Sequence, residues 1–397
     1  MISFKEAYTI VLDTANGFGE VSVPLSKADG RVLAEDILAD RDFPPFDRAT
    51  RDGIAIQVPN DTVLESYTVR GMAAAGTPQV RLEDHTDCYE IMTGAILPTG
   101  ANTVVMYEHL EITDGIAKIH QPINTGQNIH TMGSDEPKGS LLLAKGVRIT
   151  AAEIGVLAAV GKTEVLVKRN PKITLFSTGD ELVPVAEIPE PHQIRQSNSH
   201  TLRAALHELG IASEIIHITD DKERIKTALE TAMAGSDVLL LSGGVSKGKF
   251  DYLPEVLDEL GVQKQFHRVL QRPGKPFWFG QHKKTATTIF GFPGNPTSTF
   301  ANFHVYFKAW LNKGLGQPKE EIKVTVTDEF ENTTDLTRFI LAKVVLKGGI
   351  LSANLVHGNG SGDLTSLTKA NGFILVPPYG RLNQNDNTVF IPSRKVL

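Results

Sequence analysis

The feature that most limits the fold of this chain is an alternation of short apolar runs with helical segments between residues 172 and 311. Unbroken or alternating apolar runs favour strands, and apolar positions three to four apart favour helices. Strands joined by helical crossovers form a mostly parallel sheet with helices on both faces, so we expect a three-layer α/β domain. The expected strands are 172–176, 213–218, 238–241 and 287–290, and the expected helices are 199–209, 222–234, 252–260 and 297–311.

The flanks of this region contain shorter alternating runs separated by glycines, which favours β-structure. With 397 residues, two to four domains are expected. The fold class is therefore multidomain α/β plus β, with interleaved β-rich N-terminal subdomains and a barrel-like C-terminal β domain. The predicted parts are a discontinuous N-terminal subdomain (1–45 and 136–169), an inserted β-rich subdomain (46–135), an α/β ligand-binding domain (170–314) and a C-terminal β domain (315–397).

Composition excludes several classes of protein. The net charge of −6 argues against nucleic-acid or membrane binding through bulk charge. A single cysteine, Cys88, allows no intrachain disulfide and no cysteine-rich zinc site. Lys5 and Glu6 interrupt the first residues where a signal peptide needs an apolar core, and no run is long enough to cross a bilayer. We therefore expect a cytoplasmic protein.

Three expected strands run directly into loops that contain glycine. Ligands of open α/β sheets bind beyond the carboxyl ends of the strands, and glycine lets backbone N–H groups approach an anion. Helix N-termini after such loops add unpaired N–H groups. We therefore expect a phosphate-bearing ligand here, bound by Thr178, Gly179, Ser242, Gly243, Gly244, Gly294 and Asn295.

Acidic residues occur in the same loops, among them Glu181, Asp220, Asp221 and Asp251. Carboxylates beside a phosphate site are typical ligands of Mg²⁺, which prefers oxygen and bridges to phosphates. Helix capping is the alternative interpretation, because Asp220 or Asp221 can cap the helix at 222 and Asp251 the helix at 252. The sequence leaves both roles open.

Basic residues are also concentrated near the third loop, at Arg268, Arg272 and Lys275. Guanidinium groups suit bidentate binding of oxyanions, and the prolines and glycine between Arg272 and Lys275 favour a fixed turn. A solvated basic surface is the alternative. Lys247 and Lys249 are interpreted as charges at the rim.

Several motifs together resemble one known family. In chain order they are Pro44-Pro-Phe-Asp, Asp52-Gly, Ile91-Met-Thr-Gly-Ala, Gly133-Ser-Asp, Ser177-Thr-Gly-Asp-Glu-Leu, Ser242-Gly-Gly-Val-Ser, Arg272-Pro-Gly-Lys-Pro, Pro293-Gly-Asn-Pro, Arg338-Phe and Gly360-Ser-Gly. This set resembles the molybdopterin molybdenumtransferases of the MoeA type, a family that includes the C-terminal domain of gephyrin. The resemblance extends over essentially the whole chain.

The resemblance implies an α/β domain of the molybdenum-cofactor-biosynthesis type and a transferase reaction. Such an enzyme takes adenylylated molybdopterin, inserts molybdate at the dithiolene sulfurs and releases AMP, with Mg²⁺ involved. The family resemblance also implies a homodimer with a shared active site, and a contact with the adenylyltransferase of the same pathway.

Site residues follow from the resemblance position by position. Catalytic positions are Asp52, Thr93, Asp135, Glu181, Asp220 and Asp251, of which the last three are the expected metal ligands. Substrate positions are Pro293, Pro296, Arg338 and Ser361, and Arg268 and Arg272 stand where relatives can have lysine. Arg51 and Ser134 depart from the family pattern, and Arg51 is expected to be able to pair with Asp52.

Two other functions remain open at this point. One is a nucleotide-handling hydrolase or adenylyltransferase built on the same α/β domain, which would leave the N-terminal motifs without a role. The other is a non-catalytic scaffold that retains the fold, with Arg51 marking a lost site.

Overall fold

The computed structural model describes residues 1–245, 251–319 and 321–395 of the chain. Lys247 and Lys249, predicted as rim charges, lie outside the described residues. The chain divides into two compact units, the first formed by residues 1–21, 30–32 and 166–397 and the second by residues 22–29 and 33–165. The N-terminal helix thus packs in the first unit, and the finer division into four domains stays a prediction.

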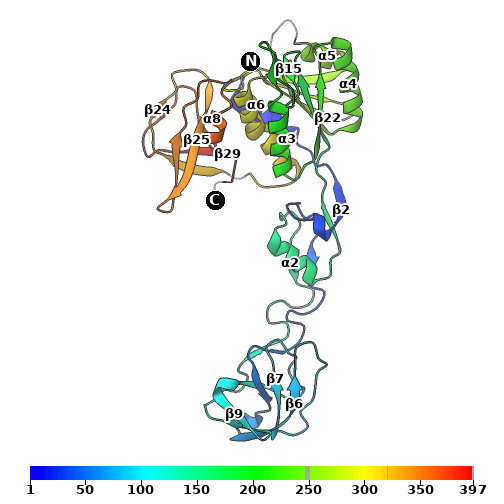
Figure 1. The fold of residues 1–397 in the computed structure, drawn as a ribbon, viewed down its shortest axis with the longest axis vertical. Coiled ribbons are helices and arrows are strands. Elements are labelled where there is room, and N and C mark those ends of the chain that lie inside the picture. The colour runs from blue at the N-terminus through cyan, green and yellow to red at the C-terminus, as the bar shows by residue number, and fades with distance from the viewer. Residues whose placement is uncertain (246–250, 320, 396–397) are drawn as a thin grey trace. The chain divides into compact units, whose positions relative to one another are not determined.

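A six-stranded sheet forms the centre of the α/β region in the first unit (Figure 1). In spatial order its strands are β17 (Ser213–Ile218), β14 (Ile173–Thr178), β18 (Val238–Ser242), β22 (Thr287–Phe292), β21 (Trp278–His282) and β19 (Val262–His267). The first four strands are parallel. Strand β21 is antiparallel to both of its neighbours, β22 and β19. The predicted mostly parallel sheet is confirmed, and it has two further strands, β21 and the edge strand β19.

Helices cover both faces of this sheet, because the apolar strands have side chains on two sides. Leu175, Leu240 and Phe290 pack on the face covered by α3 (Asn198–Glu208) and α6 (Pro296–Asn302). The adjacent residues Phe176, Leu241 and Ile289 pack on the opposite face, under α4 (Lys222–Gly235) and α5 (Leu253–Glu259). Burial on both faces explains why these strands lack a polar alternation.

The last helix of the α/β region is interrupted. Helix α6 is followed by a π-helical segment, η4 (Phe303–Phe307), and then by α7 (Lys308–Gly314). Helix α1 (Phe4–Asp13) packs against η4 and α7, and the short strand β1 (Ile2–Ser3) pairs with β20 (Val269–Arg272). A capping box of Ser3 and Glu6 lies at the start of α1.

The C-terminal sheet of the first unit closes into a barrel. Its strands are β25 (Thr337–Lys347), β26 (Ile350–Leu355), β23 (Ile322–Val326), β29 (Asn387–Pro392) and β27 (Gly372–Val376), and β27 pairs back to β25. Val324, Val344 and Phe390 are among its buried core residues. Strand β20 of the α/β region pairs in parallel with β25, which joins the barrel to the α/β region. The barrel-like prediction is confirmed.

The second unit contains a second six-stranded sheet. Its strands, in spatial order, are β8 (Thr103–Met106), β5 (Gly53–Ile56), β7 (Asp87–Ile91), β6 (Ser66–Ala73), β10 (Ile116–Ile119) and β9 (Leu110–Thr113). Strand β5 is buried throughout, and a Cβ on Gly53 would lie 1.9 Å from the Val105 carbonyl oxygen. Helix α2 (Ala151–Ala159) begins at a capping box of Thr150 and Glu153.

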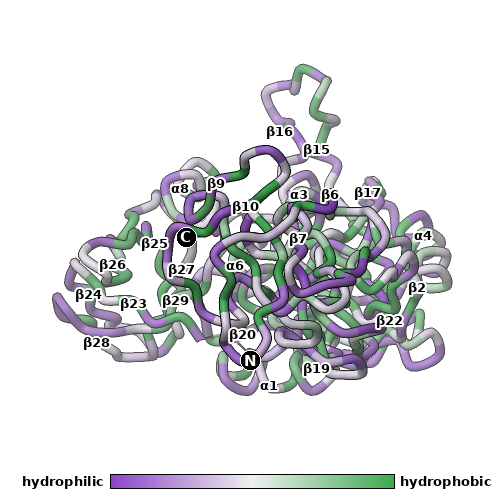
Figure 2. Tube along the Cα trace, turned by 90° about the horizontal axis from the view of Figure 1, so that it is seen from below, coloured by the Kyte–Doolittle hydropathy of each residue, from purple (hydrophilic) through white to green (hydrophobic). Residues whose placement is uncertain are grey.

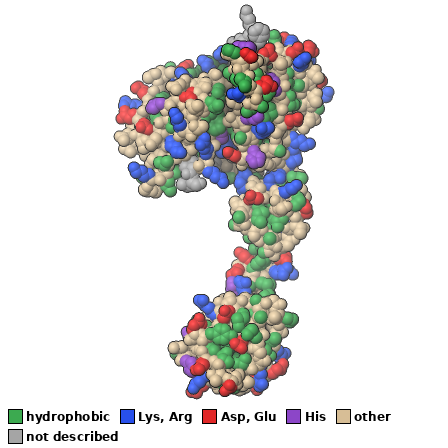
Figure 3. All heavy atoms as spheres, in the orientation of Figure 1, with side chains coloured by type: hydrophobic (Ala, Val, Ile, Leu, Met, Phe, Trp, Pro, Cys, Tyr) green, Lys and Arg blue, Asp and Glu red, His purple; other side chains and the backbone are tan. Residues whose placement is uncertain are grey.

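Short elements complete the described chain: β2 (Glu20–Pro24), β3 (Ile37–Leu38), β4 (Arg48–Ala49), β11 (Ile129–His130), β12 (Leu141–Leu143), β13 (Glu164–Lys168), β15 (Leu182–Val183), β16 (Ile194–Arg195), β24 (Phe330–Glu331), β28 (Arg381–Leu382) and α8 (Ser366–Lys369). Among the described residues, no helix is both long and apolar enough to span a lipid bilayer. Acidic and basic side chains are interspersed over the face of the molecule in Figure 3.

Candidate functional site

The glycine loops after β14, β18 and β22 lie together at the carboxyl edge of the α/β sheet. Gly243 N donates to the Phe292 carbonyl at 3.2 Å, which joins the second and third loops. A Cβ on Gly243 would lie 2.8 Å from the Thr178 carbonyl oxygen, so the first and second loops approach at a distance that only glycine allows. Gly243 and Gly244 both have positive φ, at 92° and 66°. These contacts explain the two adjacent glycines at this place.

Asn198, at the start of α3, connects two of these loops. Its side-chain amide donates to Ser242 Oγ at 3.0 Å and to the Gly294 carbonyl at 2.7 Å. Sequence reasoning did not select Asn198, because the residue precedes a helix and reads as an ordinary capping residue. Asn198 begins the first helix after the Thr178 loop. Its place at the carboxyl edge of the sheet could therefore have been inferred from the sequence.

The loops surround a pocket of about 370 Å³, here called the loop pocket. Thr178 lines this pocket, and its Oγ1 is buried against Gly244 with no hydrogen-bond partner among the described residues. Predicted residues that line the pocket are Thr178, Glu181, Ser242, Gly243, Pro293, Gly294, Asn295 and Pro296. Residues that the sequence did not indicate are Arg195, Gln196, Ser197 and Asn198.

Two predicted glycines lie behind the loop pocket and do not line it. A Cβ on Gly179 would lie 2.5 Å from Glu181 Oε2, and one on Gly244 would lie 2.7 Å from Thr178 Oγ1. Gly179 therefore leaves room for the Glu181 side chain, and Gly244 leaves room for the Thr178 side chain. The segment between β15 and β16 projects from the sheet (Figure 2), and its tip residue Ile188 is 89% exposed.

The acidic residues are concentrated beside the first loop. Burial raises the pKa of Asp220, and the charges of Asp180, Glu181 and Asp251 raise that pKa further. Asp221 caps α4 by accepting from Arg224 N at 2.8 Å, so the capping role does not belong to Asp220. The first residues of α5 show no side-chain cap. Within the part of the chain that the structure describes, no three such side chains converge on one metal position.

A second pocket, here called the basic pocket, lies between the α/β region and the barrel and measures about 360 Å³. It shares Pro276 and Asn295 with the loop pocket. Burial lowers the pKa of Arg338, and the nearby charge of Arg272 lowers it further. Arg338 Nε is buried without a partner among the described residues. Predicted residues in the lining are Arg272, Lys275, Asn295, Arg338 and Ser361.

The turn that presents Arg272 and Lys275 is held from beneath. Gln271 Nε2 donates to the Gly274 carbonyl at 3.2 Å and to Asn302 Oδ1 at 2.8 Å. Gly274 N donates to Ser298 Oγ at 3.2 Å, which ties the turn to α6. The fixed turn inferred from the proline and glycine pattern is therefore present, and these basic residues line a pocket instead of a solvated surface.

The barrel contributes to this region through the segment around Ser361. Asn295 Nδ2 donates to Ser361 Oγ at 3.0 Å, and Thr297 N donates to the Ser361 carbonyl at 3.1 Å. The proline loop and the predicted tail residue are thereby in contact. Arg268 lines neither pocket, and its backbone pairs with Phe277 and Ile2.

The second unit contains the three other predicted positions. Asp52 Oδ1 accepts from Thr93 N at 2.6 Å and from Thr93 Oγ1 at 2.8 Å, and these bonds hold the pKa of Asp52 below its ordinary value. Asp52 therefore interacts with Thr93, and among the described ion pairs none joins it to Arg51, contrary to expectation. Ser134 is exposed, beside Asp135.

Asp135 interacts with a histidine that the sequence did not indicate. His130 Nε2 lies 2.8 Å from Asp135 Oδ1, and His130 Nδ1 lies 3.1 Å from an Arg48 guanidinium nitrogen. Strand β11, which carries His130, pairs with β4, which carries Arg48. The pairing of these two strands is what brings the three side chains together.

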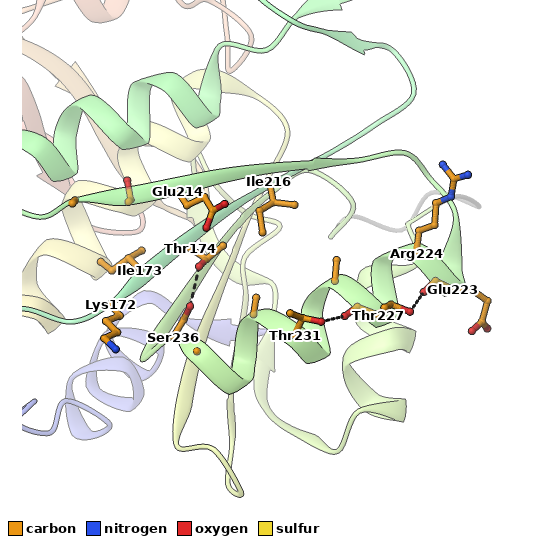
Figure 4. A pocket seen from close by; sticks show the side chains of 15 residues that line it. Lys172, Ile173, Thr174, Glu214, Ile216, Glu223, Arg224, Thr227, Thr231 and Ser236 are labelled. Atoms are coloured by element: carbon orange, nitrogen blue, oxygen red, sulfur yellow. Dashed lines mark hydrogen bonds between the residues drawn. The ribbon is translucent and has the colours of Figure 1, made fainter.

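A larger pocket of about 1050 Å³ contains none of the predicted residues. It lies along α4, from Glu223 and Arg224 near the start of that helix to Gly235 at its end, and reaches the beginnings of β14 and β17 (Figure 4). Thr174 and Ser236 share a hydrogen bond of 2.8 Å there, and Thr231 Oγ1 donates to the Thr227 carbonyl. Volume alone therefore does not mark the candidate site.

Gly243→Ala tests the close approach of the loops. Because the new Cβ would meet backbone atoms of Thr178 at a positive φ, we expect the free energy of unfolding to fall by about 1–3 kcal/mol. Urea unfolding measures this change. Gly210→Ala is the matched control, since Gly210 also has positive φ but nothing within 4 Å of its Cβ position. Equal losses in both variants would mean that the loops do not constrain Gly243.

Comparisons with known proteins agree with the motif pattern. Residues 2–161 match the MoeA N-terminal region (domain I and II), 174–313 a probable molybdopterin binding domain, and 323–387 the MoeA C-terminal region (domain IV). A molybdopterin molybdenumtransferase of Synechocystis sp. is 37% identical over 96% of both chains. One of Staphylococcus epidermidis is 31% identical over 95% of this chain and 91% of its own.

A solved structure has the same fold. The molybdopterin biosynthesis MoeA protein from Pyrococcus horikosii superposes with a TM-score of 0.82 at 32% identity, covering 98% of this chain and 99% of its own. Sequence and structure thus agree over nearly the full length, which confirms the resemblance drawn from the motifs. The chain belongs to the molybdopterin molybdenumtransferase family.

Proposed function

We propose that the chain is a transferase of molybdenum cofactor biosynthesis, which inserts molybdate into adenylylated molybdopterin and releases AMP. The observation that carries this proposal is the adjacency of the loop pocket and the basic pocket, which share Pro276 and Asn295. The reaction needs two anions side by side, and the two pockets offer neighbouring places for them. The family membership supports the same assignment.

In this proposal the loop pocket binds the adenylylated substrate. Backbone N–H groups of its glycine loops suit phosphate oxygens, and Thr178 lies in the same lining. The helix α6 begins at Pro296, immediately after the third loop, and Thr297 N donates to the Ser361 carbonyl there. The proposed substrate-binding residues here include Gly179 and Gly244, which shape the loops from behind.

Molybdate is proposed to bind in the basic pocket. Arg272 and Arg338 interact unfavourably with each other there, and an oxyanion near both would convert repulsion into two attractions. Lys275 and Ser361 supply further donors in the same lining. Arg268 is proposed to act from outside this lining, as a positive charge near the turn.

Mg²⁺ is proposed to be held by Glu181, Asp220 and Asp251. The donor set fits, because these carboxylates lie close enough for their charges to raise the pKa of Asp220, and a cation would relieve that repulsion. Mg²⁺ usually keeps several waters and binds through one or two carboxylates plus substrate phosphates, so a preformed cage of three carboxylates is not required. When bound, the ion would screen phosphate charge and activate water.

Asp52, Thr93 and Asp135 are proposed to act on the same substrate, as the family resemblance implies. The hydrogen bonds from Thr93 keep Asp52 ionised, which suits a group that orients a cation or a hydrogen-bond donor of the substrate. His130 and Arg48 would hold Asp135 in place. We also propose that the adenylyltransferase of the same pathway contacts this protein to deliver its product.

One assay separates this proposal from the two other functions. The protein is incubated with adenylylated molybdopterin, Mg²⁺ and molybdate, and AMP release and active cofactor are measured in the same samples. Both products support molybdenum insertion. AMP without active cofactor would favour a nucleotide-handling hydrolase, and the absence of both would favour a scaffold.

Asp251→Asn is expected to lower Mg²⁺-dependent turnover by about tenfold or more without unfolding the protein, because it removes one carboxylate charge from the proposed cation site. Turnover is measured as AMP release over a series of Mg²⁺ concentrations, and folding by circular dichroism. Asp258→Asn, an exposed position in α5, serves as the control. Wild-type rates in Asp251→Asn would remove Asp251 from the site.

We propose that the protein is a homodimer with the active site shared between subunits. Light scattering at micromolar concentration is expected to give about twice the mass of one chain, 43.2 kDa. A mixture of Asp52→Asn and Arg338→Gln proteins is then expected to recover part of the activity, since some mixed dimers retain one complete site. A monomeric mass, or no recovery after subunit exchange, would contradict a shared site.

A further inference from the structure

Gln196 brings a buried amide into the lining of the loop pocket. The residue is 8% exposed, and its backbone is held in place because Gln196 N donates to the Val183 carbonyl at 3.0 Å. Its side-chain amide makes no hydrogen bond to any described residue, and neither the nitrogen nor the oxygen of that amide is fully enclosed. Buried polar side chains are normally hydrogen-bonded, so a free amide that lines a pocket indicates a ligand contact.

Asn198 contributes a second group to the same lining. Both hydrogens of its amide are used, because Nδ2 donates to Ser242 Oγ at 3.0 Å and to the Gly294 carbonyl at 2.7 Å. A carbonyl oxygen can only accept, so the amide nitrogen must face Gly294 and the orientation of the amide is fixed. Asn198 Oδ1 accepts from none of the described residues and is not fully enclosed. The part of Asn198 that remains for a ligand is therefore an acceptor.

Together the two side chains offer one kind of donor and two acceptors. Gln196 supplies the donor Nε2 and the acceptor Oε1, and Asn198 supplies the acceptor Oδ1. The pyrimidine edge of a pterin has an amino group at C2, an N–H at position 3 and an oxygen at C4, which are two donors and one acceptor. The edge of adenine has one amino group beside ring nitrogens that only accept. A single carboxamide can bind adenine, but the second acceptor has a partner only in the pterin.

The remaining walls of the loop pocket suit a flat ring. Leu182, Pro276 and Pro293 are among the apolar residues of its lining. Pockets for small molecules usually combine apolar walls, which cover the faces of a ring, with a few polar groups that fix its orientation. The amides of Gln196 and Asn198 are such polar groups, and the pocket volume of about 370 Å³ accommodates a fused bicyclic ring.

We propose that Gln196, together with Asn198 Oδ1, recognises the 2-amino-4-oxo edge of the pterin ring and is a specificity-determining residue for the substrate. This assignment rests on the proposed function, because it places one part of adenylylated molybdopterin in the loop pocket. The ring edge bonds to the two amides, and the phosphate oxygens of the same molecule bind at the glycine loops. A ring that lacks the amino group leaves a buried acceptor without a partner and binds more weakly.

Fluorescence titration of the full-length protein with two matched probes tests the proposal. The probes are 6-hydroxymethylpterin and 6-hydroxymethyllumazine, which differ only in that an oxo group replaces the 2-amino group. The wild-type protein is expected to bind the pterin saturably and the lumazine about tenfold more weakly. Gln196→Leu is expected to weaken pterin binding by about tenfold and to bring the two affinities within about twofold of each other, because a hydrocarbon side chain cannot bond to either edge. Equal affinities of the wild-type protein for both probes, or no saturable binding, would overturn the proposal.

Two further variants and a third probe complete the test. Gln263→Leu, at an exposed position of β19, is the control and is expected to leave both affinities unchanged. Gln196→Glu retains an acceptor for the amino group and is expected to keep the preference for the pterin, so it replaces Gln196→Leu if that variant folds poorly. AMP, titrated in the same way, is expected to bind wild type and Gln196→Leu equally. A loss of AMP affinity with unchanged pterin affinity in Gln196→Leu would assign Gln196 to the adenine and overturn the proposal.

The AMP-release assay separates this inference from the proposed function. Gln196→Leu is expected to raise the KM for adenylylated molybdopterin by about tenfold and to leave the KM for molybdate unchanged, because the lost contact binds only the first substrate. A wild-type protein that prefers the pterin but releases no AMP would refute the proposed transferase and keep the role of Gln196. A wild-type protein that turns over normally without any preference between the two probes would refute the role of Gln196 and keep the transferase.

Discussion

Arg338→Gln is expected to lower kcat/KM for molybdate by about 100-fold, because it removes one of two guanidinium groups proposed to bind the oxyanion in a partly buried pocket. The change is expected mainly in the KM for molybdate, since the lost interaction binds the substrate itself. The KM for adenylylated molybdopterin is expected to change much less. Initial rates of active cofactor formation over a molybdate series measure both values.

The same substitution should leave the fold intact. Within the part of the chain that the structure describes, Arg338 Nε has no hydrogen-bond partner, and the guanidinium is repelled by Arg272. Its loss therefore removes these unfavourable interactions as well as the contact with the Phe330 ring. We expect the free energy of unfolding to stay within about 1 kcal/mol of wild type. Arg381→Gln is the control, because Arg381 is an exposed barrel residue paired with Glu329. Normal molybdate saturation in Arg338→Gln would exclude the basic pocket as the molybdate site.

Asp220→Asn is expected to lower activity and Asp221→Ala is expected to lower stability, although the two residues are adjacent. Asp220→Asn should lower Mg²⁺-dependent turnover by about 100-fold, because it removes a proposed ligand of the cation. Asp221→Ala should lower the free energy of unfolding by about 1 kcal/mol, because it removes the cap at Arg224 N, and should leave turnover close to wild type. AMP release over a Mg²⁺ series and urea unfolding measure the two effects.

The expected stability of Asp220→Asn follows from the direction of its pKa shift. A carboxyl pKa that is raised in the folded state means that ionisation destabilises the fold, and this loss grows as pH rises through the carboxyl range. At pH 7 a neutral asparagine removes that repulsion, so Asp220→Asn should be at least as stable as wild type. A variant that unfolds easily, or that retains full Mg²⁺-dependent turnover, would show that Asp220 has a structural role instead.

Local patterns in the sequence were sufficient to predict much of the fold. The apolar runs of the α/β region are present as strands, and helices lie between them as expected. These elements depend on interactions between residues near in sequence, or on burial that is visible as an apolar run. Strand β5 is buried throughout but consists of the short run Gly53–Ile56, which is too short and too uniformly apolar to be recognised by its length or by an alternation.

The candidate site could be predicted from the sequence only in part. The glycine loops could be placed together because parallel strands end at one edge of the sheet, and the contact of Gly243 with Thr178 follows from that rule. Asn198 and His130 could not be found, because their roles depend on partners far away in the sequence, Gly294 and Asp135 among them. A side chain that joins two loops looks, in sequence, like any helix-capping or strand residue.

By itself, the sequence determined the α/β layering, the family and the loops that carry glycine, since strand and turn preferences are local and the motifs occur in one order. Only the tertiary structure decided which acid caps α4 and which belongs with Glu181 and Asp251, because a cap requires one backbone geometry that Asp221 has and Asp220 lacks. It also decided that Arg272 and Arg338 share a pocket. That contact arises from the pairing of β20 with β25, which no local preference encodes.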